Sequence, residues 1–216
     1  MEKVKAAVVG ASGYSGEELV ALLARHPRVE IVAVTSRQSA GETIARVFPR
    51  TAGSVVAGLK FIEPSVGALE KSGAASIFLA LPHGLAAEFA GPLRKAGRQV
   101  IDLSADFRLK SADVFAEFYG GEHPAPDLLA EAVYALPEIL QGDALKGAGL
   151  IACPGCYPTS ILVPVIPLLR RGLIDPATIV INSLSGVSGA GRKADAALLF
   201  AECNESLRAY GAPKHR

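Results

Sequence analysis

The chain has 216 residues, with 22 Lys and Arg against 21 Asp and Glu, so its formal net charge is +1. That balance leaves no basic excess for nucleic acid or an anionic membrane surface. Hydrophobic residues make up 50% of the sequence and only three cysteines occur, which predicts a packed globular chain in a reducing compartment. Because neither a secretory leader nor an apolar run of membrane-spanning length is visible, we expect a cytoplasmic protein with no membrane and no nucleic-acid partner.

Strand and helix patterns alternate from the start of the chain. Val4–Val9 is typical of a buried strand, Ser15–His26 carries apolar residues at helical spacing, and Glu30–Thr35 is typical of a second strand. Glycines and prolines in Arg37–Pro64 predict loops and short strands. The later expected elements are a strand Ser76–Leu81, a helix Gly84–Ala96, strands Gln99–Asp102, Val133–Leu136 and Leu150–Ala152, and a polar turn Ser104–Arg108. This alternation predicts an α/β fold with a Rossmann-type doubly wound parallel sheet.

A glycine-rich loop, Gly10–Gly16, directly follows the first strand and opens the first helix. Glycines there permit a tight turn and a close approach of the backbone, and the free N–H groups of a helix start can hold a pyrophosphate. The G-x-x-G-x-x-G spacing therefore favours a dinucleotide site, with a βα turn without a ligand as the alternative. The second strand ends in Ser36-Arg37 instead of an acidic residue, which favours NADP over NAD unless Arg37 is merely a solvated charge.

The character of the chain changes near residue 150. We expect residues 1–150 to form the dinucleotide-binding domain and residues 151–216 to begin an α+β catalytic domain. After Pro154 the sequence predicts an apolar helix to Leu169, a strand Thr178–Leu184, a second glycine loop Gly186–Gly191 and a helix within Leu198–Leu207.

Cys156 lies just before the apolar helix, where the positive end of the helix dipole stabilises a thiolate. Such a cysteine beside a nicotinamide domain favours acyl chemistry through a thioester that is then reduced by hydride. Cys153 makes a C-x-x-C pair with it, so a redox dithiol and half of a zinc site are the alternatives. No second C-x-x-C follows, so we expect no metal, and Cys203 is interpreted as an ordinary thiol.

The sequence resembles the N-acetyl-gamma-glutamyl-phosphate reductase family, within the aspartate-semialdehyde dehydrogenase-like superfamily. The matching segments run through the whole chain in the order of the family: VVGASGYSGEEL (8–19), TSR (35–37), LALPHG (79–84), DLSADFR (102–108), YALPE (134–138), PGCYPT (154–159), SGVSGAGR (185–192) and KHR (214–216).

The resemblance implies an NADPH-dependent reduction of an acyl phosphate in arginine biosynthesis. Cys156 would attack N-acetyl-glutamyl 5-phosphate, phosphate would leave, and the thioester would be reduced to the semialdehyde. Arg108 would bind an anionic group of the substrate, with a structural bridge to Asp102 or Asp106 as the alternative. The cofactor-binding residues it implies are Gly10, Ser12, Gly13, Tyr14, Ser15, Gly16, Ser36, Arg37, Pro82, His83, Ser188, Gly189 and Gly191. Arg192 and Lys193 are further candidates for attracting phosphate.

The four histidines receive different interpretations. His215 matches the first histidine of a family His-Arg-His pattern and is the candidate general acid/base, although which histidine of the pattern transfers the proton stays open. His26 is expected to cap a helix end and His123 to be structural. For His83, cofactor binding and packing are equally favoured.

The chain departs from the family pattern in two places. Family members continue beyond residue 216, so we expect a C-terminally incomplete chain, either a fragment or one completed by another chain. Cys153 stands where the family commonly has Asn, and a thiol is a poorer hydrogen-bonding partner than an amide. The rival functions are an aminoadipyl-phosphate reductase of lysine biosynthesis and a non-catalytic NADP-binding fragment. The resemblance also implies a homo-oligomer.

Overall fold

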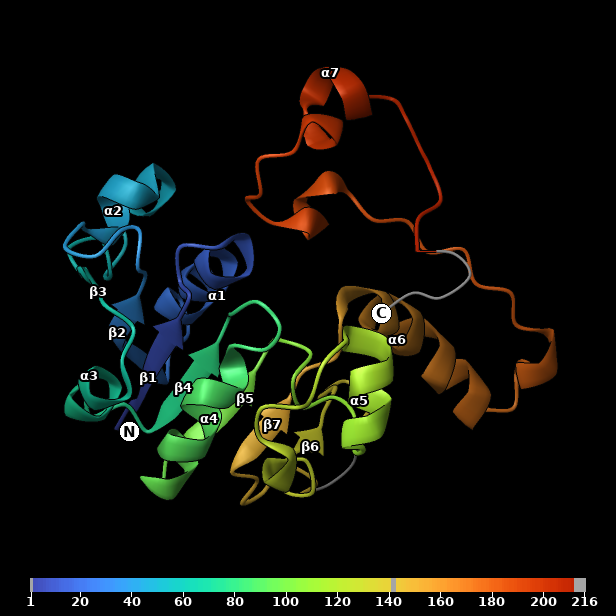
Figure 1. The fold of residues 1–216 in the computed structure, drawn as a ribbon, viewed down its shortest axis with the longest axis horizontal. Helices are drawn as coiled ribbons and strands as arrows, with labels where there is room; N and C mark the ends of the chain where they lie inside the picture. Colours follow the sequence, from blue (N-terminus) through green and yellow to red (C-terminus); the bar gives the residue numbers. More distant parts are fainter. Residues whose placement is uncertain (1, 141–142, 212–216) are drawn as a thin grey trace.

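The computed structural model describes residues 2–140 and 143–211, and its centre is a seven-stranded sheet in the order β3-β2-β1-β4-β5-β7-β6 (Figure 1). Neighbouring strands are parallel throughout this sheet. The strands are β1 (Val4–Val9), β2 (Val29–Thr35), β3 (Phe61–Ile62), β4 (Ser76–Leu79), β5 (Gln99–Asp102), β6 (Val133–Tyr134) and β7 (Leu150–Ala152). The chain winds outward from β1 in both directions, which confirms the predicted doubly wound α/β fold.

Helices cover both faces of the sheet. The helices of the chain are α1 (Tyr14–Ala24), α2 (Ile44–Val47), α3 (Val66–Lys71), α4 (Ala86–Lys95), α5 (Ala112–Tyr119), α6 (Cys156–Arg170) and α7 (Phe200–Cys203), of which α7 lies away from the sheet (Figure 1). Successive residues of β1 point to opposite faces. Ala7 and Val9 pack into the apolar cluster that contains α3 and α4, whereas Val8 packs into the cluster that contains α1 and α2. Both faces of β1 are therefore buried, as its continuous apolar sequence predicts.

The predicted strands 4–9, 99–102 and 150–152 have the bounds that the structure gives. The helix predicted at 15–26 spans 14–24, and the helix predicted at 84–96 spans 86–95. In 37–64 the structure adds the short helix α2 to the loops and to strand β3. Neither α3 nor α5 is predicted. Ser65 and Ser111, the N-cap residues of these two helices, each accept a hydrogen bond from a backbone N–H in the first turn, so the cap was the signal available in the sequence.

The strand predicted over Thr178–Leu184 is wrong. A short 3-10 helix, Pro176–Thr178, is followed by chain without regular structure, in which Val180 is 83% and Leu184 is 75% exposed. A strand needs a neighbour for its backbone hydrogen bonds, and within the described residues none lies beside this segment. The helix predicted within 198–207 is reduced to α7.

After α6 the chain leaves the sheet, and the segment that carries α7 lies above α1 and α6 in Figure 1. Within residues 2–140 and 143–211, no helix is both long and apolar enough to cross a membrane.

Candidate active site

Four loops meet at the carboxyl edge of the sheet because parallel strands all end there. The backbone ladder continues just past the strands: Ala80 N–H donates to Val9 O at 2.9 Å, Leu103 N–H to Leu79 O at 3.0 Å, and Cys153 N–H to Asp102 O at 2.8 Å. The glycine loop after β1, the Pro82–Gly84 turn after β4, the Ser104–Arg108 turn after β5 and the cysteine loop after β7 are thereby brought side by side.

The glycines of the first loop have different physical roles. Gly10 has φ +75°, and a Cβ there would collide with the carbonyl of Ala80. A Cβ on Gly16 would lie 2.5 Å from Gly10 O and 2.6 Å from Ala11 Cα, so α1 can approach β1 only with glycine at this position. Gly13 has an ordinary φ of −75°, and its Cβ would lie 3.6 Å from Gly10 O. The fold thus requires Gly10 and Gly16, whereas a Cβ on Gly13 would make only ordinary van der Waals contact.

Among the residues that the structure describes, no side chain caps the start of α1. Gly13 is the N-cap of α1 and gives no side-chain cap to the first-turn N–H groups, with Tyr14 and Ser15 exposed beside it. Such N–H groups attract anions. Thr35, which the sequence analysis did not single out, holds the loop in place: Gly10 N–H donates to its Oγ1 at 3.3 Å and Ala11 N–H to its carbonyl at 2.9 Å.

A cavity of about 320 Å³ opens beside this loop, a volume within the range of small-molecule sites. It brings together several residues predicted to bind the cofactor: Gly10, Ser12, Gly13, Ser36, Arg37 and Pro82. The Ser12 and Ser36 hydroxyls are 2.8 Å apart and join the two loops. Arg37 is exposed, and the ion pairs found in the described ranges do not involve it.

Asp106 joins two of the loops and is fully buried. Its Oδ1 accepts a hydrogen bond from Gly84 N–H at 2.7 Å and its Oδ2 from Ala87 N–H at 3.1 Å. Because α4 has no side-chain cap of its own at Leu85, Asp106 serves as a cap supplied from another loop. This contact fixes the Pro82–Gly84 turn against the turn that carries Arg108.

Asp102 ends β5 and is also fully buried. Burial raises the pKa of its carboxyl from 3.8 to about 6, while hydrogen bonds from Ser104 to the carboxylate act in the opposite direction. Ser104 donates both its N–H and its hydroxyl to Asp102, each at 2.9 Å. The side chain therefore shapes the turn that follows the strand.

Cys156 is the first residue of α6 and its side chain is exposed, as a nucleophile at a helix N-terminus requires. Cys153 behaves differently: burial, and then the charge of Asp102, raise the pKa of its thiol to about 11. The described cysteines are free thiols, and no group of three His, Cys, Asp or Glu side chains within the described ranges could hold a metal ion. Of the two residues of the C-x-x-C pair, Cys156 is thus the more exposed one.

Arg108 lies beneath the cysteine loop. Its Nε donates to Cys153 O at 2.8 Å and one terminal nitrogen donates to Leu103 O at 2.9 Å, while the other terminal nitrogen would lie 3.1 Å from a Cβ on Gly155. The alternative of a bridge to Asp102 or Asp106 does not match these contacts, because Arg108 binds carbonyls and not carboxylates in the described structure. It connects the turn after β5 to the residues that precede Cys156.

The three histidines in the described ranges have different surroundings. His123 is buried, with Nδ1 accepting from Ala125 N–H at 3.0 Å and Nε2 placed 2.6 Å from Asp106 O, so it is structural. His26 accepts from Arg28 N–H at 3.2 Å just after α1. His83 Nδ1 accepts from Ala105 N–H at 3.1 Å, which leaves the proton of a neutral ring on Nε2. His215, the predicted acid/base, lies outside the described residues.

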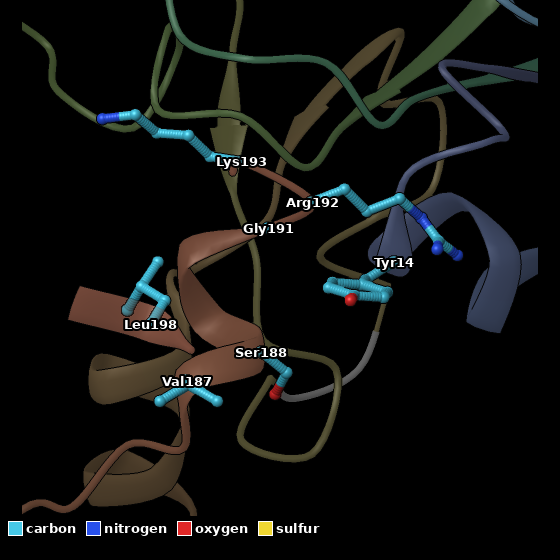
Figure 2. A pocket seen from close by; sticks show the side chains of 7 residues that line it. All are labelled: Tyr14, Val187, Ser188, Gly191, Arg192, Lys193 and Leu198. Atoms are coloured by element: carbon cyan, nitrogen blue, oxygen red, sulfur yellow. The ribbon is translucent and has the colours of Figure 1, made fainter. Parts of the chain in front are cut away.

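The second glycine loop lies against the start of α1. It contains a short 3-10 helix, Val187–Ala190, and with Tyr14 it lines a cavity of about 390 Å³ (Figure 2). Ser188 and Gly191, both predicted to contact the cofactor, line this cavity together with Arg192 and Lys193, and Gly189 lies between them in the chain. The two glycine loops, far apart in sequence, are therefore neighbours in space.

A glycine turn, an uncapped helix start and a cavity of suitable size at the carboxyl edge of a parallel sheet define an α/β dinucleotide-binding protein. The family model for the semialdehyde dehydrogenase NAD-binding domain matches residues 5–148, and the model for the semialdehyde dehydrogenase dimerisation domain matches residues 156–216. The chain belongs to the semialdehyde dehydrogenase family, and its cofactor is a nicotinamide dinucleotide.

Curated relatives match over the whole chain. N-acetyl-gamma-glutamyl-phosphate reductase of Akkermansia muciniphila is 55% identical over 100% of this chain, and that of Moorella thermoacetica is 49% identical over 99%. The chain spans 62% and 60% of the length of these two relatives.

Solved structures of lower identity share the fold. Aspartate semialdehyde dehydrogenase II of Vibrio cholerae, complexed with ASA, aligns with a TM-score of 0.61 at 20% identity, over 89% of this chain and 49% of that one. Aspartate semialdehyde dehydrogenase of Candida albicans, solved with NADP, aligns with a TM-score of 0.56 at 20% identity, over 80% of this chain and 48% of that one.

Proposed function

We propose that this chain carries the cofactor site and the nucleophile of an NADPH-dependent reductase that converts N-acetyl-glutamyl 5-phosphate to N-acetyl-glutamate 5-semialdehyde and phosphate in arginine biosynthesis. The observation that carries the proposal is the exposed Cys156 at the start of α6, at the same sheet edge as the dinucleotide loop. The relatives at 55% and 49% identity bear the name of this reductase.

The reaction proceeds through a thioester on Cys156. Its thiolate attacks the acyl carbon, the bond from that carbon to the phosphate oxygen breaks, and inorganic phosphate leaves. NADPH, when bound, supplies the hydride that reduces the thioester carbonyl. Collapse of the resulting hemithioacetal returns the thiolate and releases the aldehyde, with His215 as the proposed proton donor and acceptor. Arg108, adjacent to the cysteine loop, is proposed to bind an anionic group of the substrate.

The cofactor is proposed to lie along the first glycine loop. The pyrophosphate is bound at the uncapped start of α1 by Gly10, Ser12, Gly13, Tyr14, Ser15 and Gly16. The nicotinamide lies next to Pro82 and His83. The second loop closes the site with Ser188, Gly189 and Gly191. Ser36 and the exposed Arg37 take the 2′-phosphate, which is why we propose NADP and not NAD. Replacing Arg37 by Met is expected to weaken NADPH binding while leaving NADH binding unchanged, whereas equal losses for both would contradict this role.

Three further assignments accompany this function. We propose a domain boundary near residue 150, with residues 1–150 binding the cofactor and residues 151–216 belonging to the catalytic domain. A homo-oligomer is proposed because the dimerisation-domain model matches residues 156–216. The free cysteines fit the reducing conditions of the cytoplasm, where we place the protein.

The direct test is phosphate-dependent reduction of NADP with N-acetyl-glutamate semialdehyde. We expect activity in the wild type, its loss in Cys156→Ser, and retention of most of it in the matched control Cys153→Ser, whose thiol is held protonated. Turnover of the aminoadipyl compound in preference to the glutamyl one would move the function to lysine biosynthesis. NADP binding without any turnover would show a cofactor-binding chain that is not catalytic.

A further inference from the structure

Arg192 makes three separate contacts with the first glycine loop and the helix that it opens. Its Nε donates to Ser12 O at 3.0 Å, a terminal nitrogen donates to Glu17 Oε2 at 2.5 Å, and the guanidinium carbon lies 4.3 Å from the centroid of the Tyr14 ring. The partners lie 180 and 175 residues away in sequence for the two hydrogen bonds. The planar guanidinium group of Arg192 donates hydrogen bonds from two of its edges and stacks on a ring with its face, so these contacts fix its orientation. A lysine ammonium could not make this combination of contacts.

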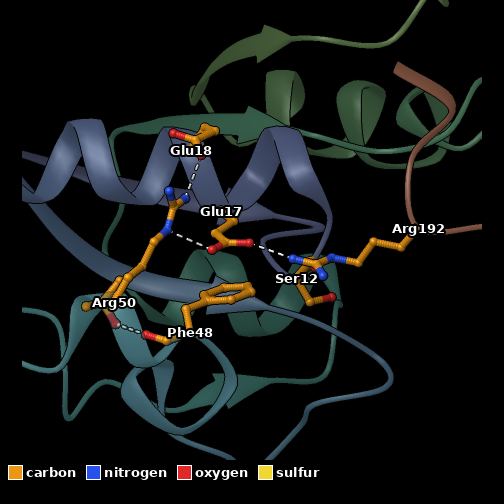
Figure 3. A network of polar contacts seen from close by, with 7 residues as sticks. Ser12, Glu17, Glu18, Phe48, Arg50 and Arg192 are labelled. Carbon is orange, nitrogen blue, oxygen red and sulfur yellow. Dashed lines mark hydrogen bonds and ion pairs between the residues drawn. The ribbon is translucent and has the colours of Figure 1, made fainter. Parts of the chain in front are cut away.

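A second arginine, Arg50, also contacts the Glu17 carboxylate and helps to fix its position. Arg50 Nε lies 2.8 Å from Glu17 Oε1, and another of its nitrogens lies 2.7 Å from Glu18 Oε1 (Figure 3). The Glu17 side chain is only 14% exposed, so its carboxylate is held in place with Oε2 turned toward Arg192. One carboxylate in the first turn of α1 thus joins the residue 49–51 segment to the second glycine loop.

The second loop presents two cations, but they point in different directions. In Figure 2, Arg192 reaches toward Tyr14 at the start of α1, whereas Lys193 extends the opposite way. Lys193 lies 3.7 Å from Asp195 on its own segment. The sequence analysis placed both residues as candidates for attracting phosphate, yet only Arg192 contacts the loop that is proposed to hold the pyrophosphate.

We propose that Arg192 is a positioning residue that fastens the second glycine loop over the first, so that the cofactor is enclosed between the two. Its guanidinium binds protein groups at the rim of the cavity, and this places Ser188 and Gly191 opposite Tyr14. The inference rests on the proposed function, because it assumes that a nicotinamide dinucleotide occupies the first loop. The inference adds that the affinity for the cofactor depends on the contacts of Arg192 with the first loop, which the cofactor itself does not make.

The test compares Arg192→Met with Arg46→Met, which removes the same charge from an exposed ion pair with Glu42 at 2.7 Å. We expect Arg192→Met to raise the Kd and KM for NADPH on the order of tenfold, because it removes a charge-assisted hydrogen bond and a cation–π contact. The KM for the acyl phosphate and the melting temperature are expected to stay close to those of the wild type. Arg46→Met should leave all four quantities unchanged.

Two further variants separate positioning from simple structural support. Arg192→Lys keeps the charge opposite Glu17 and is expected to recover part of the NADPH affinity. In the double variant Glu17→Gln with Arg192→Met, the loss of NADPH affinity should be smaller than the sum of the losses in the two single variants, because both substitutions remove the same Arg192–Glu17 contact. Unchanged NADPH affinity in Arg192→Met would overturn the inference, as would a double-variant loss equal to the sum of the two single losses. Neither result would contradict the proposed reductase function. Absence of NADPH binding in the wild type would overturn both.

Discussion

The two glycines Gly13 and Gly16 give opposite expectations for the same substitution. A Cβ on Gly16 would meet Gly10 O at 2.5 Å and Ala11 Cα at 2.6 Å, and both atoms are backbone, so the turn itself must shift. Overpacking of this kind costs about 1–3 kcal/mol. In a domain of this size each kcal/mol lowers the melting temperature by about 2–4 °C. We therefore expect Gly16→Ala to lower it by up to about 12 °C, the product of the two upper values.

Gly13→Ala is expected to leave stability within about 0.5 kcal/mol of the wild type, because its Cβ would sit in ordinary contact 3.6 Å from Gly10 O. The same methyl group would lie at the uncapped start of α1, where we propose that the pyrophosphate binds, so NADPH affinity should fall by about tenfold or more. Thermal unfolding and fluorescence titration with NADPH, run on both variants, check the two effects. If Gly13→Ala binds NADPH as the wild type does, the loop does not hold the pyrophosphate as we describe.

Three predictions concern polar side chains behind the site, two of which are fully buried. Since the folded pKa of Asp102 is raised to about 6, its stabilising effect is fully present below 3.8 and is lost as pH rises through about 6, a change of about 3 kcal/mol; Asp102→Asn should remove this slope from urea-unfolding free energies, and an unaltered slope would contradict the raised pKa. Asp106→Asn presents an amide NH₂ to a backbone N–H, so it should destabilise the protein by about 1–3 kcal/mol, with faster hydrogen exchange at Gly84 and Ala87 unless the cap is unimportant. Arg108→Met should cost about 1–3 kcal/mol and change the rate of Cys156 alkylation, since two carbonyls lose their donor; equal alkylation rates would separate Arg108 from the cysteine loop.

The sheet could be predicted from the sequence because its central strands lie between neighbours. Val4–Val9 has a strand on each side and its last four residues are buried, and Gln99–Asp102 also lies between two strands, with Val100 and Asp102 buried. Thr178–Leu184 has a similar composition but no neighbouring strand in the described structure. The local sequence indicates a tendency to form a strand, but a strand forms only where a neighbouring strand is available for pairing.

The sequence could predict the local geometry of the candidate site at positions where neighbouring residues decide it. Gly10 and Cys156 are such positions, since a positive φ and a helix start are properties of a few neighbouring residues. Arg192, Glu17 and Asp106 could not be assigned in the same way. Their partners are distant in sequence, by 175 residues for Glu17 and Arg192, so only the fold brings the charges together.

The central claim is that Cys156, next to the dinucleotide loop, forms an acyl thioester. The most direct measurement mixes the protein with NADP and N-acetyl-glutamate semialdehyde in the absence of phosphate, and then digests it for mass spectrometry. We expect one equivalent of NADPH to form per active site, and the N-acetyl-glutamyl group to appear on the peptide that contains Cys156. In Cys156→Ser neither should appear. NADPH formation without acylation of Cys156, or acylation that persists in the Ser variant, would contradict the mechanism.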